Sequence, residues 1–175
     1  MTSPPPPPEA PLILTLALDE LTSRFFNELR RDHFPPARNF LAAHLTLFHH
    51  LPGTERAAIE QVLAAYVRKQ PSLVLQVSGV QFLGQGVAYR VESEALEALH
   101  RDLQQQWWPQ LTPQDQQRRR PHVTVQNKVQ PEVARALHQE LATDFTPFAA
   151  TGTGLQLWAY RNGPWEWLRD FPFAS

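Results

Sequence analysis

The sequence predicts a single domain of mixed strands and helices, built from two similar halves. Hydrophobic patterns typical of strands and of amphipathic helices alternate along the chain. The pattern His-apolar-Thr-apolar also occurs twice, at residues 44–47 and at residues 122–125, about half of the folded chain apart. Together these two observations indicate an internal duplication. The 175 residues are enough for one domain with a substantial core.

The composition excludes several classes of site. The 16 basic and 17 acidic residues give a net charge of −1, so no field over the whole surface attracts nucleic acid, and any RNA contact must be local. The chain has no cysteine, which excludes disulfides, thiolate nucleophiles and cysteine-based metal sites. The same absence agrees with a reducing compartment.

The N-terminal segment, residues 1–11, is predicted to be a disordered tail. Residues 4–8 and residue 11 are all proline, which cannot donate backbone hydrogen bonds and favours an extended polyproline conformation. The folded domain is therefore expected over residues 12–175. No apolar stretch approaches the ~20 residues that span a bilayer, and the N-terminus does not resemble a secretory signal. We expect a cytoplasmic protein without a membrane segment.

The first half begins with a strand and a helix. Residues 12–18 are almost all apolar and predict a buried strand. Asp19 is expected to cap a helix that continues to about Asp32 and ends before Pro35 and Pro36. The apolar face of this helix is predicted to consist of Leu21, Phe25, Phe26 and Leu29.

The first tetrad is predicted to lie on the next strand. Residues 40–48 have strand-like alternation, and Pro52 and Gly53 indicate a turn. Thr54 is expected to be the N-cap of a helix that continues to about Arg68. Two strands then follow, at residues 73–83 and 87–91, joined by a hairpin that contains Gly84 and Gly86.

The second half repeats the alternation. A helix is expected from Glu94 to Trp107, followed by a polar surface loop at residues 109–120. The inward face of that helix is predicted to be core packing by Leu96, Leu99, Leu103 and Trp107.

The remaining elements follow in the same order. Val123 and Val125 indicate the second tetrad strand, and Pro131 is expected to open a helix that ends near Thr143. Two further strands are predicted at the C-terminal end, one from residue 145 to residue 160 with a break at Gly152 and Gly154, and one over residues 165–171.

The two tetrads carry the strongest functional signal. In an extended strand successive side chains alternate between faces, so His44 and Thr46 point one way, and His122 and Thr124 behave likewise. The apolar residues of each tetrad then point into the core. A single tetrad is typical of an ordinary amphipathic strand, but two copies favour a site. If both polar faces line one cleft, two imidazoles and two hydroxyls surround a volume suited to acid–base chemistry on a phosphate.

The tetrads, together with the turn at residues 51–53 and the Arg120-Pro121 pair, resemble the two-histidine phosphoesterase superfamily. The resemblance is to the bacterial RNA 2′,3′-cyclic phosphodiesterases, also called 2′-5′ RNA ligases. It implies an α+β fold with two pseudo-symmetric lobes, in which two antiparallel sheets face a central cleft and the helices pack outside. It also implies His122 as base and His44 as acid, phosphate binding by Thr46 and Thr124, and no cofactor.

The chemistry of these residues agrees with that activity. Opening a cyclic phosphodiester needs a base to activate water and an acid to protonate the departing ribose oxygen. Histidine titrates near neutral pH and can serve in either role. Threonine hydroxyls can stabilise charge on the non-bridging oxygens, so a metal is not required. The residues themselves do not decide which histidine is the acid.

Weaker candidates lie close to the tetrads. Arg118, Arg119 and Arg120 could steer an RNA phosphate to the cleft, although such a short run of charge is usually a solvated loop. Lys128 is equally ambiguous, and Tyr160 or Trp158 could stack on a base. The pair at residues 49 and 50 is expected at the surface or at the end of a strand.

Three functions remain open on the sequence. The first is metal-independent hydrolysis of RNA 2′,3′-cyclic phosphate to a 2′-phosphate, with reversible 2′-5′ ligation. The second is hydrolysis of a small cyclic nucleotide or nucleotide-derived metabolite, and the third is nucleotide binding without turnover. Fold and motif do not separate the first two. We expect a monomer that binds RNA ends or nucleotides carrying a cyclic phosphate, with no metal and no membrane partner.

Overall fold

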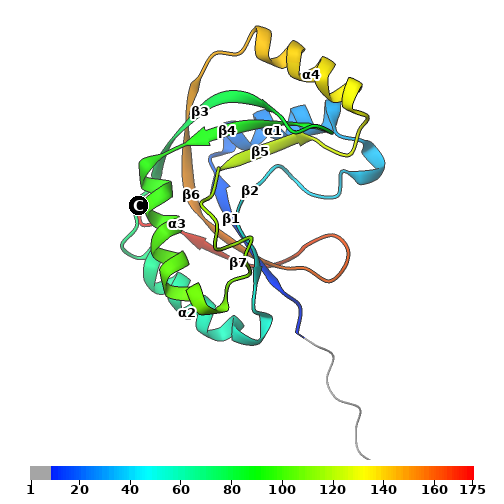
Figure 1. Cartoon of the computed structure of the whole chain (residues 1–175). Helices are drawn as coiled ribbons and strands as arrows, with labels where there is room; N and C mark the ends of the chain where they lie inside the picture. The colour runs from blue at the N-terminus through cyan, green and yellow to red at the C-terminus, as the bar shows by residue number, and fades with distance from the viewer. Residues whose placement is uncertain (1–8) are drawn as a thin grey trace, which may run out of the picture.

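Figure 1 shows the computed structural model of the chain, which describes residues 9–175. Most of the predicted tail, residues 1–8, lies outside the described residues. Of the remainder, Ala10 packs against the edge of the core, and the carbonyl oxygen of Pro11 accepts a hydrogen bond of 3.0 Å from the backbone N–H of Tyr160. The last residues before the first strand are therefore bound to the fold.

The strands form one antiparallel seven-stranded sheet. Its order is β2-β1-β6-β3-β4-β5, with β7 paired to β6. The strands are β1 (Leu12–Leu18), β2 (Leu45–Leu51), β3 (Leu73–Phe82), β4 (Val87–Glu92), β5 (His122–Gln126), β6 (Phe148–Ala159) and β7 (Glu166–Pro172).

The strand order reflects the predicted duplication. The first half supplies β1, β2 and β3, and the second supplies β4, β5 and β6, so that β2-β1-β6 at one end matches β5-β4-β3 at the other. The expected α+β class with antiparallel strands is confirmed. The strands of the two lobes are joined between β6 and β3 into one sheet. The sheet curls strongly, and Cα atoms of its outer strands β2 and β5 come within 8 Å of each other.

Four α-helices of the described residues pack against the sheet, the first and the third on strands of the opposite half. They are α1 (Glu20–His33), α2 (Arg56–Val67), α3 (Glu94–Trp107) and α4 (Pro131–Thr143). Figure 1 shows α1 and α4 at one end of the molecule and α2 and α3 at the other. Phe26 of α1 contacts Tyr89 of β4 edge-on, with ring centroids 5.5 Å apart. Conversely, the ring of His100 of α3 stacks on the ring of Phe48 of β2, with ring centroids 4.7 Å apart.

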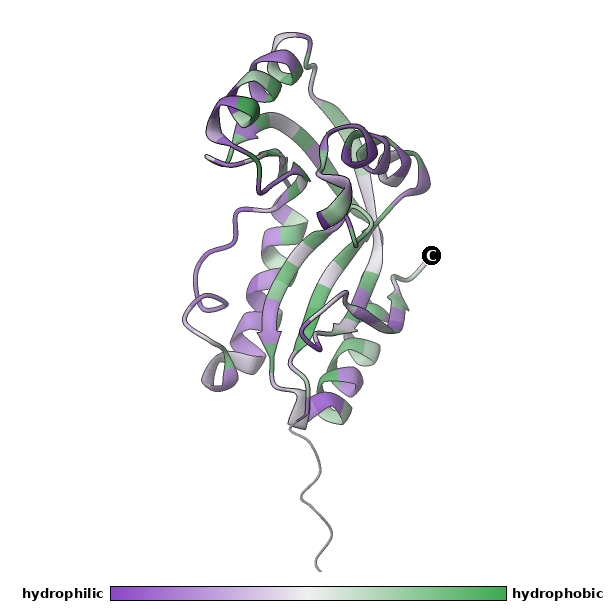
Figure 2. Cartoon of the chain, turned by 90° about the vertical axis from the view of Figure 1, so that its right-hand side faces the viewer, coloured by the Kyte–Doolittle hydropathy of each residue, from purple (hydrophilic) through white to green (hydrophobic). Residues whose placement is uncertain are grey.

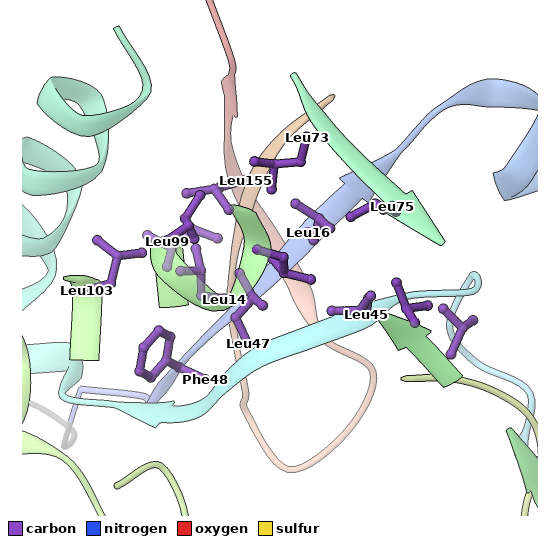
Figure 3. Close-up of a cluster of buried hydrophobic side chains, with 14 of the residues drawn as sticks. Leu14, Leu16, Leu45, Leu47, Phe48, Leu73, Leu75, Leu99, Leu103 and Leu155 are labelled. Atoms are coloured by element: carbon purple, nitrogen blue, oxygen red, sulfur yellow. The ribbon is translucent and has the colours of Figure 1, made fainter. Parts of the chain in front are cut away.

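The core lies between the sheet and the helices. Leucines from β1, β2, β3, β6 and α3 meet there with Phe48 (Figure 3). Figure 2 shows hydrophobic residues along the strands and hydrophilic ones on the outer faces of the helices. The predicted inward face of α3 is confirmed, because Leu96, Leu99, Leu103 and Trp107 are all buried.

Two predicted helix starts agree with the structure. Asp19 accepts a hydrogen bond of 2.9 Å from the backbone N–H of Thr22, which is typical of an N-cap. Pro131 is the first residue of α4, where its missing N–H has no partner to lose. The predicted N-cap at Thr54 is wrong. Residues 53–55 form a 3₁₀ turn, and α2 begins at Arg56 without a side-chain cap.

The predicted apolar face of α1 is confirmed at Phe26, which is buried, and at Leu29, which packs against the core, but it is wrong at Leu21. The buried residues are Thr22, Phe26 and Arg30, while Leu21 is 75% exposed. The face is set by Arg30, whose guanidinium has hydrogen-bond acceptors inside the fold, and by Phe26. An apolar pattern could not reveal a helix face that includes an arginine.

Strands β2 and β6 differ most from the prediction. Strand β2 begins only at Leu45, because the backbone N–H of Ala43 donates to the side chain of Asn27 (2.7 Å) instead of pairing with a strand. Strand β6 continues through Gly152 and Gly154 without a break. A Cβ atom on Gly154 would lie 2.7 Å from the carbonyl oxygen of Phe171, so glycine there permits close approach of β7.

Within residues 9–175, no helix is both long enough and apolar enough to cross a membrane.

Candidate functional site

The two tetrad histidines are held in the same way. His44 directly precedes β2, and its Nδ1 lies 2.8 Å from the carbonyl oxygen of Ala42. His122 is the first residue of β5, and its Nδ1 lies 2.9 Å from the carbonyl oxygen of Arg120. A carbonyl oxygen only accepts, so each Nδ1 carries the proton. Each neutral ring therefore presents the lone pair of Nε2 for chemistry.

The threonines follow the expected alternation. Thr46 and Thr124 are half-buried, whereas the neighbouring residues 45, 47, 123 and 125 are fully buried. The apolar members of the tetrads anchor both strands in the core. The hydroxyls are left on the same strand faces as the histidines.

The curled sheet brings the two tetrads toward one region. His44 of the first and Thr124 of the second line one cavity of about 330 Å³. His122 lines another cavity, of about 940 Å³. The histidines are close enough for the charge of one to influence the other, since a positive charge on His122 lowers the pKa of His44.

A buried arginine fixes the second tetrad from the first half of the chain. Arg30 of α1 is only 4% exposed, and its Nη1 donates to the carbonyl oxygen of Thr124 at 2.8 Å. Its Nε and Nη2 both donate to Oδ1 of Asn39, at 3.2 and 3.1 Å. The guanidinium also lies 4.1 Å above the ring of Phe34. Burial lowers the pKa of Arg30 to about 10, so the side chain stays charged at neutral pH.

A second arginine fixes the first tetrad from the second half. Arg119 donates from Nη2 to the carbonyl oxygen of Thr46 at 3.0 Å, and its Nη1 lies 3.3 Å from Nδ1 of His49. Burial lowers the pKa of Arg119. Each tetrad strand is thus held by an arginine that comes from the other half.

A buried carboxylate near Arg119 also holds the backbone of β2. Asp115 is fully buried and accepts backbone hydrogen bonds from His49 at 2.9 Å and from His50 at 2.8 Å. Burial would raise the pKa of Asp115, but the hydrogen bonds from these residues outweigh it, and the pKa is lowered. The pairing of β2 with β1 shifts by one residue between the pairs Thr15↔Thr46 and Leu14↔Phe48, so Leu47 and Phe48 are both buried and His49 does not follow them into the core.

The surroundings keep both tetrad histidines neutral in the free protein. Burial lowers the pKa of His44 to about 4, and the charge of Arg30 acts in the same direction. Burial also lowers the pKa of His122, with a further contribution from Arg119. The hydrogen bonds from Nδ1 oppose both shifts without reversing them. A bound phosphate would stabilise the protonated forms and raise both values.

An aromatic wall stands beside His44. The ring of Trp165, in the loop between β6 and β7, lies 4.7 Å from that of His44 at an angle of 56°. Trp158 lies behind it, 6.2 Å from Trp165, and donates from Nε1 to Oγ1 of Thr15 at 2.9 Å. Trp158 therefore supports the wall from β6.

The weaker candidate residues lie at different places relative to the two cavities. Lys128 is exposed and lines the cavity of His44, whereas Arg120 is exposed and lines the cavity of His122. Tyr160 is 41% exposed and lines neither of these two cavities. Within residues 9–175, no three His, Asp or Glu side chains are grouped so that they could hold a metal ion.

Several residues near the tetrads were not found from the sequence. Arg30 was hidden in a helix, and Trp165 in a C-terminal strand pattern. The side chain of His49, expected at the surface or at a strand end, is only 34% exposed and faces Asp115. Arg119 belongs to the run at residues 118–120, whose charge predicts a contact with an RNA phosphate and not the hydrogen bond that Arg119 makes to Thr46. No local signal predicts the contacts of these four residues, since each is brought in by partners distant in sequence.

The chain is similar to a known protein family and to several solved structures. A family model described as the 2′-5′ RNA ligase superfamily matches residues 18–164. No curated protein matches the sequence. The crystal structure of TT0787 of Thermus thermophilus is similar, with a TM-score of 0.69 at 16% identity, covering 93% of this chain and 97% of that one.

Other solved structures show the same fold. LigT of E. coli in complex with 3′-AMP has a TM-score of 0.60 at 20% identity, covering 95% of this chain and 99% of that one. A structure described as a phosphoesterase has a TM-score of 0.59 at 19% identity, with 95% and 99% covered. At these identities the likeness concerns the fold, which these proteins share over nearly their whole length.

Proposed function

Because the chain belongs to the 2′-5′ RNA ligase superfamily, we propose that it is a phosphodiesterase that opens RNA 2′,3′-cyclic phosphates without a metal. The observation that carries this proposal is the matched state of His44 and His122. Both rings are held through Nδ1 by a carbonyl oxygen two residues earlier, so both present Nε2. An imidazole pair of this kind supplies a base and an acid.

The reaction needs one proton transfer at each histidine. Nε2 of His122 takes a proton from water, and the oxygen of that water attacks the phosphorus. The bond from phosphorus to O3′ breaks, and protonated Nε2 of His44 gives its proton to O3′. The products are a free 3′-hydroxyl and a 2′-phosphate. If the 5′-hydroxyl of another RNA replaces water, the same steps form a 2′-5′ bond.

The threonines are assigned to the phosphate itself. The hydroxyls of Thr46 and Thr124 would donate to the non-bridging oxygens, where charge develops in the transition state. Support for this role comes from their strands, whose carbonyl groups at these two residues are fixed by Arg119 and Arg30. A donor that is positioned in advance stabilises the transition state without reorganising during the reaction.

Nucleotides are the natural probes for this proposal. LigT of E. coli was crystallised with 3′-AMP, with NADP⁺ and with ATP. For this chain we assign the exposed Arg120 and Lys128 as candidate contacts to substrate phosphates, since they line the cavities of His122 and His44. Tyr160 is a more distant candidate, limited to a long substrate.

The deciding experiment compares cyclic mononucleotides with oligonucleotides that end in a 2′,3′-cyclic phosphate. We expect turnover to a 2′-phosphate, identified by ³¹P spectroscopy. Replacement of His44 or His122 by alanine should reduce kcat by about 10²–10⁴-fold, the usual contribution of one acid–base group. Circular dichroism checks that each variant is folded, and His50→Ala, at an exposed position of β2, is the matched control.

Each alternative function has its own outcome in this experiment. Efficient turnover of cyclic mononucleotides with no gain for oligonucleotides would favour a hydrolase of small metabolites. Nucleotide binding without turnover of any cyclic phosphate would favour a binding module. A near wild-type rate in either histidine variant would show that its assigned role is wrong.

A further inference from the structure

Two adjoining cavities extend away from the tetrads on the side of His122. The first, of about 940 Å³, contains His122 together with Arg90, Arg118, Arg119 and Arg120. The second, of about 520 Å³, shares Arg118 and Arg119 with the first and is also lined by Trp108. We call these two cavities the arginine groove. By comparison, the cavity beside His44 and Thr124 measures only about 330 Å³.

Arg90 lines the groove beside His122. It lies directly opposite His122 in the pairing of β4 with β5, so both side chains are on the same face of the sheet. A Cβ atom on Gly79 would lie 2.6 Å from Nη2 of Arg90, which means that the guanidinium lies across this glycine. Its Nε also donates to Oγ of Ser78 at 3.3 Å. The chain thus leaves room for a charge fixed beside His122.

The groove has an excess of positive charge that the whole protein lacks. Its arginines include Arg101 as well as Arg90 and the run at residues 118–120, against the carboxylates of Glu92 and Glu97. The whole chain has a net charge of −1. Such a local excess attracts an anionic strand to one surface without making the protein generally basic.

The arginines are available to different degrees. The side chain of Arg118 is 85% exposed, and its contact with Glu97, at 3.6 Å, is a surface pair that contributes little to stability. The side chain of Arg118 can therefore turn toward a bound phosphate with little loss of stability. The Nη2 of Arg119 is already bound to the carbonyl oxygen of Thr46 and its Nε is buried, so Arg119 contributes its charge to the groove and not an accessible hydrogen-bonding edge.

Trp108 supplies an aromatic surface in the second cavity of the groove. It follows the last residue of α3 and is 46% exposed, although Trp107 next to it is buried. An exposed aromatic ring in a basic groove suits a nucleic acid base, since base stacking on aromatic side chains does not depend on sequence.

We propose that the arginine groove holds the RNA strand on the 5′ side of the cyclic phosphate, with phosphates at Arg90 and Arg118 and a base on Trp108. This inference rests on the proposed function, because it places the cyclic phosphate at His122. It assigns the substrate class, since a single nucleotide reaches only one end of the groove. A single-stranded oligonucleotide would occupy its length.

The test measures binding of single-stranded RNA that ends in a 2′-phosphate, which the enzyme cannot hydrolyse further. Fluorescence anisotropy compares a labelled tetranucleotide with a mononucleoside 2′-phosphate as competitor. We expect the tetranucleotide to bind the wild-type protein at least tenfold more tightly. Trp108→Ala should remove about tenfold of that gain, as expected for one stacked base. Trp167→Ala, at an exposed tryptophan on β7, is the matched control.

The arginines are tested by salt dependence. Arg118→Gln and Arg90→Gln should each reduce the slope of log Kd against log salt by about 0.7, the value for one phosphate contact of a single strand. Arg24→Gln, at an exposed arginine of α1, should leave the slope unchanged. Because Arg118 is highly exposed, its variant remains a valid test even if the replacement at Trp108 or Arg90 unfolds the protein.

The outcomes separate this inference from the proposed function. Equal affinity for the tetranucleotide and the mononucleotide would overturn the groove assignment, as would equal effects of the groove variants and their controls. If RNA binds through the groove but no cyclic phosphate is hydrolysed, the proposed function is wrong and the assignment of the groove as an RNA-binding site is upheld. If cyclic mononucleotides are hydrolysed without any preference for length, the reaction stands and the groove assignment fails.

Discussion

Arg30, on the first helix, donates a hydrogen bond of 2.8 Å to the carbonyl oxygen of Thr124, on a strand 94 positions further along the chain. The bond joins the two halves of the duplicated fold at one of the tetrads. Arg119 makes the reciprocal connection to the carbonyl oxygen of Thr46. These two arginines position the backbone of both tetrads, so stability and activity are linked in this protein.

Arg30→Ala should destabilise the fold. The replacement leaves the carbonyl oxygen of Thr124 and the side chain of Asn39 without their buried donor, and we expect the free energy of unfolding to fall by about 2–4 kcal/mol. Urea unfolding measures the change. Arg24→Ala, which removes only an exposed pair with Glu20, should cost at most about 0.5 kcal/mol. Equal effects of the two replacements would contradict the role of Arg30.

The dependence of kcat/KM on pH should have its maximum on the acid side of pH 6.5. This parameter reports the free protein, in which one histidine must be protonated and the other neutral. Since the pKa of His44 is lowered to about 4 and the pKa of His122 is also lowered, the protonated form is lost early as pH rises. We expect kcat/KM to fall about tenfold per pH unit above the higher value.

The same argument predicts a different profile for kcat. A bound phosphate stabilises protonated imidazole and raises both pKa values, so the maximum of kcat should lie at higher pH than that of kcat/KM. Initial rates between pH 4 and 9 measure both profiles. A kcat/KM that stays flat or rises above pH 6.5, where chemistry limits the rate, would contradict two titrating histidines.

Thr46→Val and Thr124→Val should reduce activity more than stability. Valine keeps the shape of the strand residue and removes the hydroxyl, so each variant should lose about 10²-fold in kcat, the effect of removing one well-aligned donor. The free energy of unfolding should change by less than about 1 kcal/mol, since the hydroxyls are only half-buried. Thr151→Val, at an exposed position of β6, is the control. Loss of stability equal to the loss of activity would indicate a structural role.

His100 should make the fold sensitive to acid. Its ring is 6% exposed and stacks on Phe48, its Nε2 has no hydrogen-bond partner, and burial lowers its pKa to about 4. The unfolded chain binds the proton more tightly than the folded one, so stability is full above pH 6.5 and is lost as pH falls toward 4. The loss from this residue should be about 3 kcal/mol.

His100→Phe keeps a stacked ring that does not titrate. Urea unfolding at pH 7 and at pH 4.5 should therefore show a smaller loss of stability in the variant than in the wild-type protein. Parallel losses in the two proteins would show that protonation of His100 does not contribute.

Treatment with a chelator should leave kcat unchanged. The proposed reaction uses two imidazoles and two hydroxyls, and residues 9–175 contain no group of three His, Asp or Glu side chains suited to a metal. Rates with and without EDTA, followed by addition of Mg²⁺, Mn²⁺ or Zn²⁺, measure this. A loss that one of these metals restores would place the enzyme in a different mechanistic class.

The sequence by itself determined the features that depend on near neighbours. The alternation at the tetrads, the cap at Asp19 and the helix that starts at Pro131 each involve residues only a few positions apart. Such local rules also predicted most strands and the α+β class. They failed where a distant partner replaced the local one, as at Ala43, whose N–H binds Asn27 and delays the start of β2.

Only the tertiary structure decided how the halves combine. Packing of α1 on strands of the second half, and of α3 on strands of the first, brings Arg30 to Thr124 and places Phe48 against His100. A buried arginine is stable only where acceptors surround it, and those acceptors come from separate parts of the chain. The sequence therefore determined which side chains the strands present, and long-range hydrogen bonds and packing decided what surrounds them.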